Sequence, residues 1–202
     1  HRGGIFMDGF NTDLYAQIER LKEIILSNEV LNSVLIKAQK LGLKNYYAGA
    51  GCIAQTVWNN QMGFDLLHGI SDIDFVYYDS SDLSYEAENS TIEYIKNGIS
   101  PCPLKLDIKN QARVHLWYKD HFGYDIEPYK SIEEAINTWP TTATSIGVRF
   151  ENEKVKIYAP FGLNDLFGMI VRANKTKITE EIYMQKVNKW KSKWPALTII
   201  PW

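Results

Sequence analysis

The stretch 46–79 constrains the fold more than any other part of the chain. A turn of small residues, Gly49-Ala50-Gly51, separates a short apolar run from a helix-like segment, and Asp72 and Asp74 follow inside a second apolar run. Side chains on a β-strand alternate between its two faces, so these two carboxylates should project together while Ile73 faces the core. Parallel carboxylates repel one another, and a divalent cation relieves that repulsion. The stretch therefore predicts a magnesium-dependent nucleotide site.

The Gly49-Ala50-Gly51 turn is suited to binding phosphate. Small residues let backbone amides approach a ligand closely, and the helix expected over 52–60 would present its anion-favouring N-terminus there. Ser71, just before the carboxylate strand, can add a hydroxyl contact. The three turn residues and Ser71 are therefore predicted to contact the nucleotide.

A third carboxylate is expected on a later strand. The alternation over 104–108 is typical of a half-buried strand, with Asp107 on its polar face. With Asp72 and Asp74 it would complete a set that holds two Mg²⁺ ions, one against a triphosphate and one that lowers the pKa of an acceptor hydroxyl. Taken alone, however, Asp107 would be an ordinary surface-facing strand residue, and an isolated D-x-D pair is more often a strand-end cap.

The segment 110–115 is expected to continue this strand. Arg113 and His115 would then lie one pleat apart, at the edge of the site. Arg113 is a candidate for bidentate phosphate binding, with a structural ion pair as the equal alternative. Later in the chain, Arg149, Arg172 and Lys175 form a scattered basic set whose members could each reach a triphosphate or lie on the surface.

Hydrophobic periodicity predicts one α/β (α+β) domain over residues 1–202, with a mixed, twisted sheet of about five strands flanked by helices. An N-terminal helical pair is expected at 11–42, its first helix capped by Asn11 or Thr12, and a C-terminal helix at 179–193. The expected strands are 46–48, 72–78, 104–108, 143–150 and 154–159, and further helices are expected at 82–97 (ended by Gly98), within 125–139 and at 164–171.

Composition narrows the partners. A net charge of −2 argues against a broad basic surface for long nucleic acids, although it leaves room for a local basic pocket. Two cysteines give no disulfide framework, and no apolar run approaches the ~20 residues that span a bilayer. We therefore expect a cytoplasmic protein without a membrane partner.

The order of glycine-containing turn, helix, D-x-D strand and third aspartate strand resembles the polymerase-β-type nucleotidyltransferase superfamily. The strings GAGCIAQTVWN and SDIDFVYYD are similar to the head domains of tRNA CCA-adding enzymes. The wider pattern over about 41–194, with NQARVH, TATSIGVRF and APFGLNDLFGMIVRANK, resembles a bacterial nucleotidyltransferase-like family of undefined substrate. Two features depart from these patterns: Ala50-Gly51 stands where Gly-Gly or Gly-Ser is usual, and Ala54 and Gln55 stand where CCA-adding enzymes carry an arginine.

The resemblance implies transfer of a nucleoside monophosphate from an NTP to an acceptor hydroxyl, with release of pyrophosphate and with Mg²⁺ as cofactor. Asp72, Asp74 and Asp107 would be the catalytic and metal-binding residues. The acceptor stays open between a small molecule, a protein and an RNA. The competing hypothesis is a non-catalytic nucleotide-binding or protein-interaction module that keeps the fold, although an intact carboxylate set favours an enzyme.

Overall fold

A computed structural model describes residues 7–202 of the chain; residues 1–6, which the single-domain prediction includes, lie outside the described residues. The helices are α1 (Leu14–Ser27), α2 (Glu29–Lys40), α3 (Gly51–Met62), α4 (Tyr85–Ile99), α5 (Val114–Phe122), α6 (Ile132–Ile136), α7 (Asn164–Phe167) and α8 (Glu180–Lys193), with a 3₁₀ turn η1 (Gln111–Arg113). The strands are β1 (Tyr46–Gly49), β2 (Asp72–Tyr77), β3 (Lys105–Asn110), β4 (Gly147–Glu151), β5 (Lys154–Tyr158), β6 (Ile170–Val171) and β7 (Thr198–Ile199).

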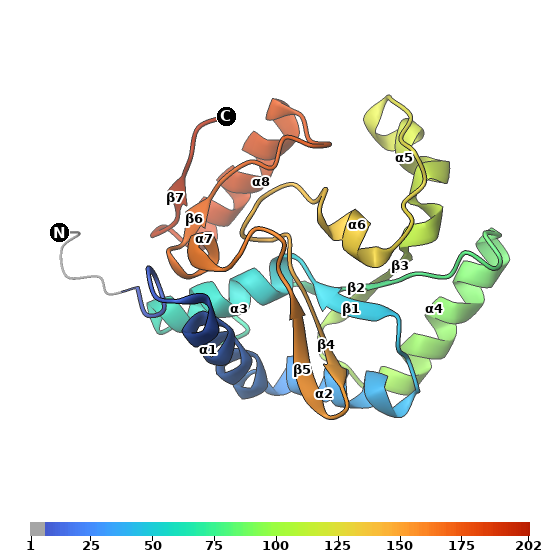
Figure 1. Cartoon of the computed structure of the whole chain (residues 1–202), viewed down its shortest axis with the longest axis horizontal. Helices are drawn as coiled ribbons and strands as arrows, with labels where there is room; N and C mark the ends of the chain where they lie inside the picture. The colour runs from blue at the N-terminus through green and yellow to red at the C-terminus, as the bar shows by residue number, and fades with distance from the viewer. Residues whose placement is uncertain (1–6) are drawn as a thin grey trace.

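The predicted five-stranded mixed sheet is confirmed, with the order β3-β2-β1-β4-β5. Strands β2 and β3 run parallel, and the other neighbours in this sheet are antiparallel. A parallel pair needs a crossover connection, which α4 provides between β2 and β3. Helices α1 and α2 lie on one side of the sheet, and α5 and α8 lie on the other (Figure 1). The sheet therefore separates a helical support from the side that carries the carboxylates.

The N-terminal helical pair is present, with a different first cap. The side chain of Asp13, rather than Asn11 or Thr12, accepts a hydrogen bond from the backbone N–H of Ala16 and caps α1. Asn28 caps α2 and also donates to Thr56 Oγ1 on α3 at 3.1 Å. The two helices are thereby joined to the helix that opens at the small-residue turn.

The core fills the space between the sheet and these helices. Its largest fully buried side chains include Trp58 on α3, Phe75 on β2 and Trp194 at the end of α8. The helical spacing of Tyr183, Val187, Trp190 and Trp194 predicts one apolar stripe on the last helix; Tyr183, Val187 and Trp194 are buried, and Trp190 is partly buried against the core. A separate small cluster holds α5, with Tyr118 and Val114 packed on Tyr129 and Ala135.

Three predicted elements are wrong in part. Helix α4 continues through Gly98 to Ile99, since a Cβ at this glycine would lie 2.4 Å from Leu41 and its absence allows close packing on α2. The helix expected over 164–171 ends at Phe167. Met169 then adopts a φ of 53°, after which Ile170–Val171 pairs with Thr198–Ile199 in a small second sheet.

The segment 110–115 also differs from its prediction. The side chain of Asn110 accepts a hydrogen bond from the N–H of Ala112 at 3.0 Å, which turns the chain out of β3 and into η1 and α5. Arg113 and His115 are therefore not neighbours on a strand. Across residues 7–202, none of the helices has the length and apolar character needed to cross a membrane.

Candidate active site

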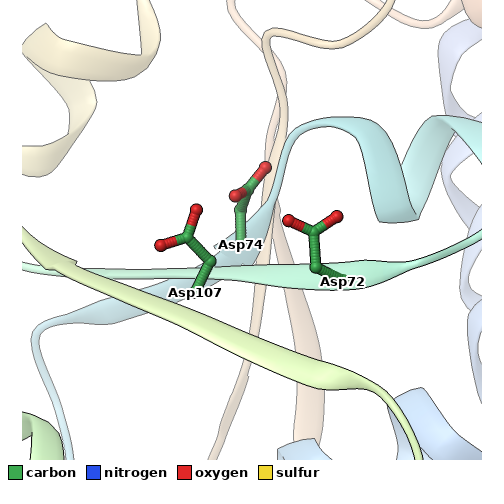
Figure 2. A group of neighbouring side chains, drawn as sticks. All are labelled: Asp72, Asp74 and Asp107. Carbon is green, nitrogen blue, oxygen red and sulfur yellow. The ribbon is translucent and has the colours of Figure 1, made fainter.

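Three aspartates converge on the face of the sheet that α5 and α8 flank. In the parallel β2–β3 pair, Asp74 lies opposite Asp107, and Asp72 is two residues before Asp74 on the same strand. Each contributes a carboxylate oxygen to a group in which all ligand atoms lie within 4.8 Å of one another. Figure 2 shows the three side chains leaving their strands in the same direction. The alternation of side chains along each strand, with Ile73, Phe75 and Leu106 buried, produces this grouping.

The electrostatics of the group are unbalanced. Burial, together with the nearby charges of Asp107 and Asp72, raises the pKa of Asp74 to about 7, against the opposing effect of Lys109 and Lys186. Lys109 Nζ lies 3.4 Å from Asp107 Oδ2 and is half exposed, so its compensation is modest. Three hard oxygen donors with excess negative charge form a set that fits a divalent cation such as Mg²⁺.

In the Gly49-Ala50-Gly51 turn, the unusual backbone conformation lies at the alanine and not at either glycine. Its residue with positive φ is Ala50, at φ 54° and ψ −133°, and its N–H donates to the carbonyl of Ile146 at 3.0 Å. Gly49 is required for packing, because a Cβ there would lie 2.6 Å from that same carbonyl oxygen. Gly51 and Cys52 begin α3 and line the cavity described below. The first amides of a helix lack intrahelical acceptors, so this end of α3 is suited to an anion.

The side-chain amide of the buried Asn59 anchors the loop before β2. Asn59 Nδ2 donates to the carbonyls of Leu66 and His68 at 2.9 and 2.8 Å, and its Oδ1 accepts from Trp194 Nε1 at 2.7 Å. At the end of this loop, Ser71 Oγ donates to Asp72 Oδ1 at 3.1 Å. Ser71 thus lies beside the carboxylates, as the sequence suggested.

A cavity of about 780 Å³ lies above the carboxylates and is lined by residues of both α5 and α8. Its floor includes the three aspartates, Ser71, Ala50 and Gly51. The wall next to α8 carries lysines, namely Lys177, Lys186, Lys189 and Lys193, and Lys109 projects from β3. The opposite wall is aromatic and includes Trp117, Tyr118, His121, Phe122, Tyr129 and Trp139. The volume is typical of a small-molecule site.

Arg113 does not reach this cavity. Its guanidinium forms an ion pair with Glu88 on α4 and donates from Nε to the carbonyl of Leu83 at 2.8 Å. The structural ion pair, left open by the sequence, is therefore what the structure contains. Because Arg113 is engaged outside the cavity, it has no part in the function proposed below.

The scattered basic set also lies elsewhere. Arg149 stacks over Tyr47 with 4.6 Å between its Cζ and the ring centroid, Arg172 pairs with Asp165, and Lys175 stacks on Trp202. Each of these side chains already has a partner away from the cavity.

Sequence reasoning missed the lysines of α8. Lys186, Lys189 and Lys193 recur at spacings of three and four residues, on the face of α8 next to the buried Tyr183 and Val187. Their helical spacing is the sequence signal that could have identified them, next to the apolar stripe that predicted the helix.

The comparisons with known proteins agree with this arrangement. Among solved structures, one described as an NMR structure that "reveals a CCA-adding enzyme head domain" superposes with a TM-score of 0.75, covering 98% of this chain and 100% of that chain at 23% identity. At this identity the likeness shows the fold. No curated protein matches the chain significantly. A family model described as nucleotidyltransferase matches residues 37–199, which is most of the sequence and includes all three aspartates. The predicted resemblance is therefore confirmed, and the chain belongs to the nucleotidyltransferase family.

Proposed function

We propose that this protein transfers a nucleoside monophosphate from an NTP to an acceptor hydroxyl and releases pyrophosphate. The observation that carries the proposal is the convergence of Asp72, Asp74 and Asp107 within 4.8 Å at the floor of a ligand-sized cavity. The family match supports the same reaction class. A module that only bound a nucleotide would have no need to keep three carboxylates this close together.

The donor set is suited to Mg²⁺. Asp72 and Asp74 would hold one ion, and both residues with Asp107 would hold a second. When bound, the two ions would neutralise charge on the triphosphate and lower the pKa of the acceptor hydroxyl. The raised pKa of Asp74 supports this assignment, since it reflects burial of the carboxylate first and then the charges of Asp107 and Asp72, which nearby lysines leave partly uncompensated.

The chain's own groups would then position the reactants. The first amides of α3, at Gly51 and Cys52, would contact the triphosphate, and Ser71 would keep the Asp72 carboxylate oriented. The acceptor oxygen forms a bond to the α-phosphorus while the bond from that phosphorus to its bridging oxygen breaks, and pyrophosphate leaves. The hydroxyl proton passes to Asp107, which lies on the β3 side of the group.

The cavity favours a small acceptor over a long nucleic acid. Its volume suits one substrate pair, and the net charge of −2 provides no extended basic surface beyond it. The aromatic wall on α5 follows directly after β3, so an acceptor next to Asp107 would lie against Trp117 and Tyr118. We propose a small hydroxyl-bearing molecule as the acceptor, with a protein side chain or an RNA end as the alternatives.

The test uses ligand-induced thermal stabilisation. Wild-type protein is melted with each of the four NTPs, with and without Mg²⁺, alongside Asp72→Asn and Asp74→Asn. We expect at least one NTP to raise the melting temperature in a Mg²⁺-dependent manner in the wild type only. Stabilisation of equal size in both variants would overturn the metal assignment.

Catalysis is tested separately. Incubation with the stabilising NTP, labelled at the α-phosphate, and a small-molecule fraction of cell extract should transfer label to a new product with release of pyrophosphate. Mg²⁺-dependent binding without any labelled product, across small-molecule, protein and RNA fractions, would favour the non-catalytic module instead.

A further inference from the structure

One face of α8 presents lysines to the cavity. Lys186, Lys189 and Lys193 line it, while Tyr183 and Val187 on the neighbouring face are buried in the core. The helix packs directly on α3, because the Trp58 ring makes edge-on contacts with the rings of Trp190 and Trp194, with centroid distances of 5.6 and 5.3 Å. The lysine face lines the same cavity as the start of α3 and the carboxylates, and Lys186 interacts electrostatically with Asp74 and Asp72.

The lysines of α8 divide into two groups by their partners. Lys191 Nζ donates to the carbonyls of Pro195 and Leu197, and Lys193 Nζ donates to the carbonyl of Gly69 at 3.2 Å. Within residues 7–202, neither Lys186 nor Lys189 has a hydrogen bond or an ion pair from its ammonium group. The first group has a structural role, and the second leaves two positive charges directed at the cavity.

These two charges are costly to keep together without an anion. Lys186 is half-buried, and burial lowers the pKa of its ammonium group, as do the neighbouring charges of Lys189 and Lys109, against the opposing attraction of Asp74 and Asp72. An anion with several charges placed between the two lysines would relieve this repulsion.

The opposite side of the same space has amides but no cations. Helix α3 contains no lysine or arginine, and its first residues, Gly51 and Cys52, line the cavity together with Gln55. A polyphosphate has more charge than helix amides alone can balance, because a helix N-terminus supplies only about half an elementary charge. Among the described residues, the cavity-lining ammonium groups without a hydrogen bond or ion pair are those of Lys186 and Lys189 on α8 and of Lys177 shortly before that helix, and they can supply the remainder.

We propose that Lys186 and Lys189 form a polyphosphate-binding surface that holds the triphosphate against the start of α3 without requiring a metal ion. The inference rests on the proposed function, since it assigns the polyphosphate to the NTP substrate. It goes beyond that function by separating phosphate binding, on α8, from the carboxylate group on β2 and β3. The two parts therefore fail independently in an experiment.

The probe is inorganic tripolyphosphate in the presence of EDTA, measured by calorimetric titration at low salt. Wild-type protein should bind it, and the Lys186→Gln/Lys189→Gln double variant should bind at least about tenfold more weakly, since two charge-assisted contacts are lost. Lys154→Gln on β5 removes the same charge from an exposed strand outside the cavity and should match the wild type. Lys186→Arg/Lys189→Arg should retain binding, and raising the salt concentration should weaken it.

Each outcome decides one point. Absence of tripolyphosphate binding by the wild type, or equal binding by the folded double glutamine variant, overturns the phosphate surface. A parallel loss in the Lys154→Gln protein also overturns it, because the effect would then be one of overall charge. If the double variant loses tripolyphosphate binding while Asp72→Asn keeps it, the surface stands even where the Mg²⁺-dependent NTP test fails.

Discussion

Asp74 and Asp107 are register partners on two parallel strands, so their carboxylates leave the sheet side by side. The α4 crossover that parallel pairing requires brings together two residues that are distant in sequence. The result is a pair of like charges in which Asp74 is mostly buried and Asp107 is partly exposed. Without a cation, the charge of the buried Asp74 opposes folding.

Removing the charge of Asp74 should stabilise the metal-free protein at alkaline pH. Burial, Asp107 and Asp72 raise its pKa from 3.8 to about 7, against Lys109 and Lys186. The folded state then binds the proton more tightly than the unfolded state, so ionisation destabilises the fold progressively from about pH 4 to 7. At pH 8, Asp74→Asn should raise the free energy of unfolding by up to about 4 kcal/mol, less where water reaches the carboxylate.

Urea unfolding in EDTA at pH 4.5, 6 and 8 measures this effect. The gap between Asp74→Asn and the wild type should widen with pH. A constant gap would mean that Asp74 titrates normally.

Loss of Asp107 should remove activity without unfolding the protein. Outer-shell partners of metal ligands contribute about 10- to 100-fold to affinity or activity, so a direct ligand should contribute at least about 100-fold. Asp107→Asn should therefore reduce Mg²⁺-dependent transfer by that factor, measured as release of pyrophosphate. Asp120→Asn, an exposed substitution on α5, is the matched control and should retain full activity. Comparable losses in both variants would contradict a specific role for Asp107.

The turn before α3 stores backbone strain at a residue that is not glycine. Ala50 has φ 54° and ψ −133°, a conformation that L-residues rarely adopt and that costs about 1–3 kcal/mol. Ala50→Gly should relieve this strain, and after the entropy that glycine adds to the unfolded chain the net gain should be about 1 kcal/mol. Ala54→Gly, in the interior of α3, should instead destabilise by about 1 kcal/mol or more. Chemical denaturation distinguishes the two, and losses of stability in both variants would refute the strain.

Gly98 should tolerate no side chain despite its position in a helix. A Cβ there would lie 2.4 Å from Leu41 Cδ2, so Gly98→Ala should cost about 1–3 kcal/mol by overpacking although alanine favours helices. Asn97→Ala, at the exposed neighbouring position, should be neutral or stabilising. In a Leu41→Ala background the penalty at Gly98 should largely disappear, which thermal unfolding of the four proteins would show. An unchanged penalty in that background would exclude Leu41 as its cause.

The sequence was informative wherever a local pattern controlled the outcome. Alternation along β2 and β3 predicted which face Asp72, Asp74 and Asp107 share, and strand pairing then brought them within 4.8 Å. The helical spacing of Tyr183, Val187, Trp190 and Trp194 likewise predicted the apolar face of α8, on which Trp190 is only partly buried. Their catalytic and metal-binding roles stay a proposal.

Long-range partners account for most of what the sequence did not reveal. Ile170–Val171 forms a strand only because Thr198–Ile199 pairs with it, and Arg113 is engaged because Glu88 on α4 lies beside it. The turn at Asn110 depends on a hydrogen bond to its own side chain. Asparagine favours such turns, so this element was predictable from the local sequence. The position of the α8 lysines beside the cavity depends on the packing of α8 across from α5, which local sequence patterns do not reveal.

The hydrogen bonds of Asn59 also have a mechanical consequence. This one side chain joins α3, the loop that leads into β2, and Trp194 at the end of α8. Helix α3 with the turn before it, strand β2 and helix α8 should therefore fluctuate as one rigid unit. Helix α5 instead packs in its own small cluster, and the hydroxyls of Tyr118 and Tyr124 connect it to the carbonyl of Lys177. Slow fluctuations that widen the cavity should thus displace α5 with its aromatic side chains, while α8 with its lysines stays in place.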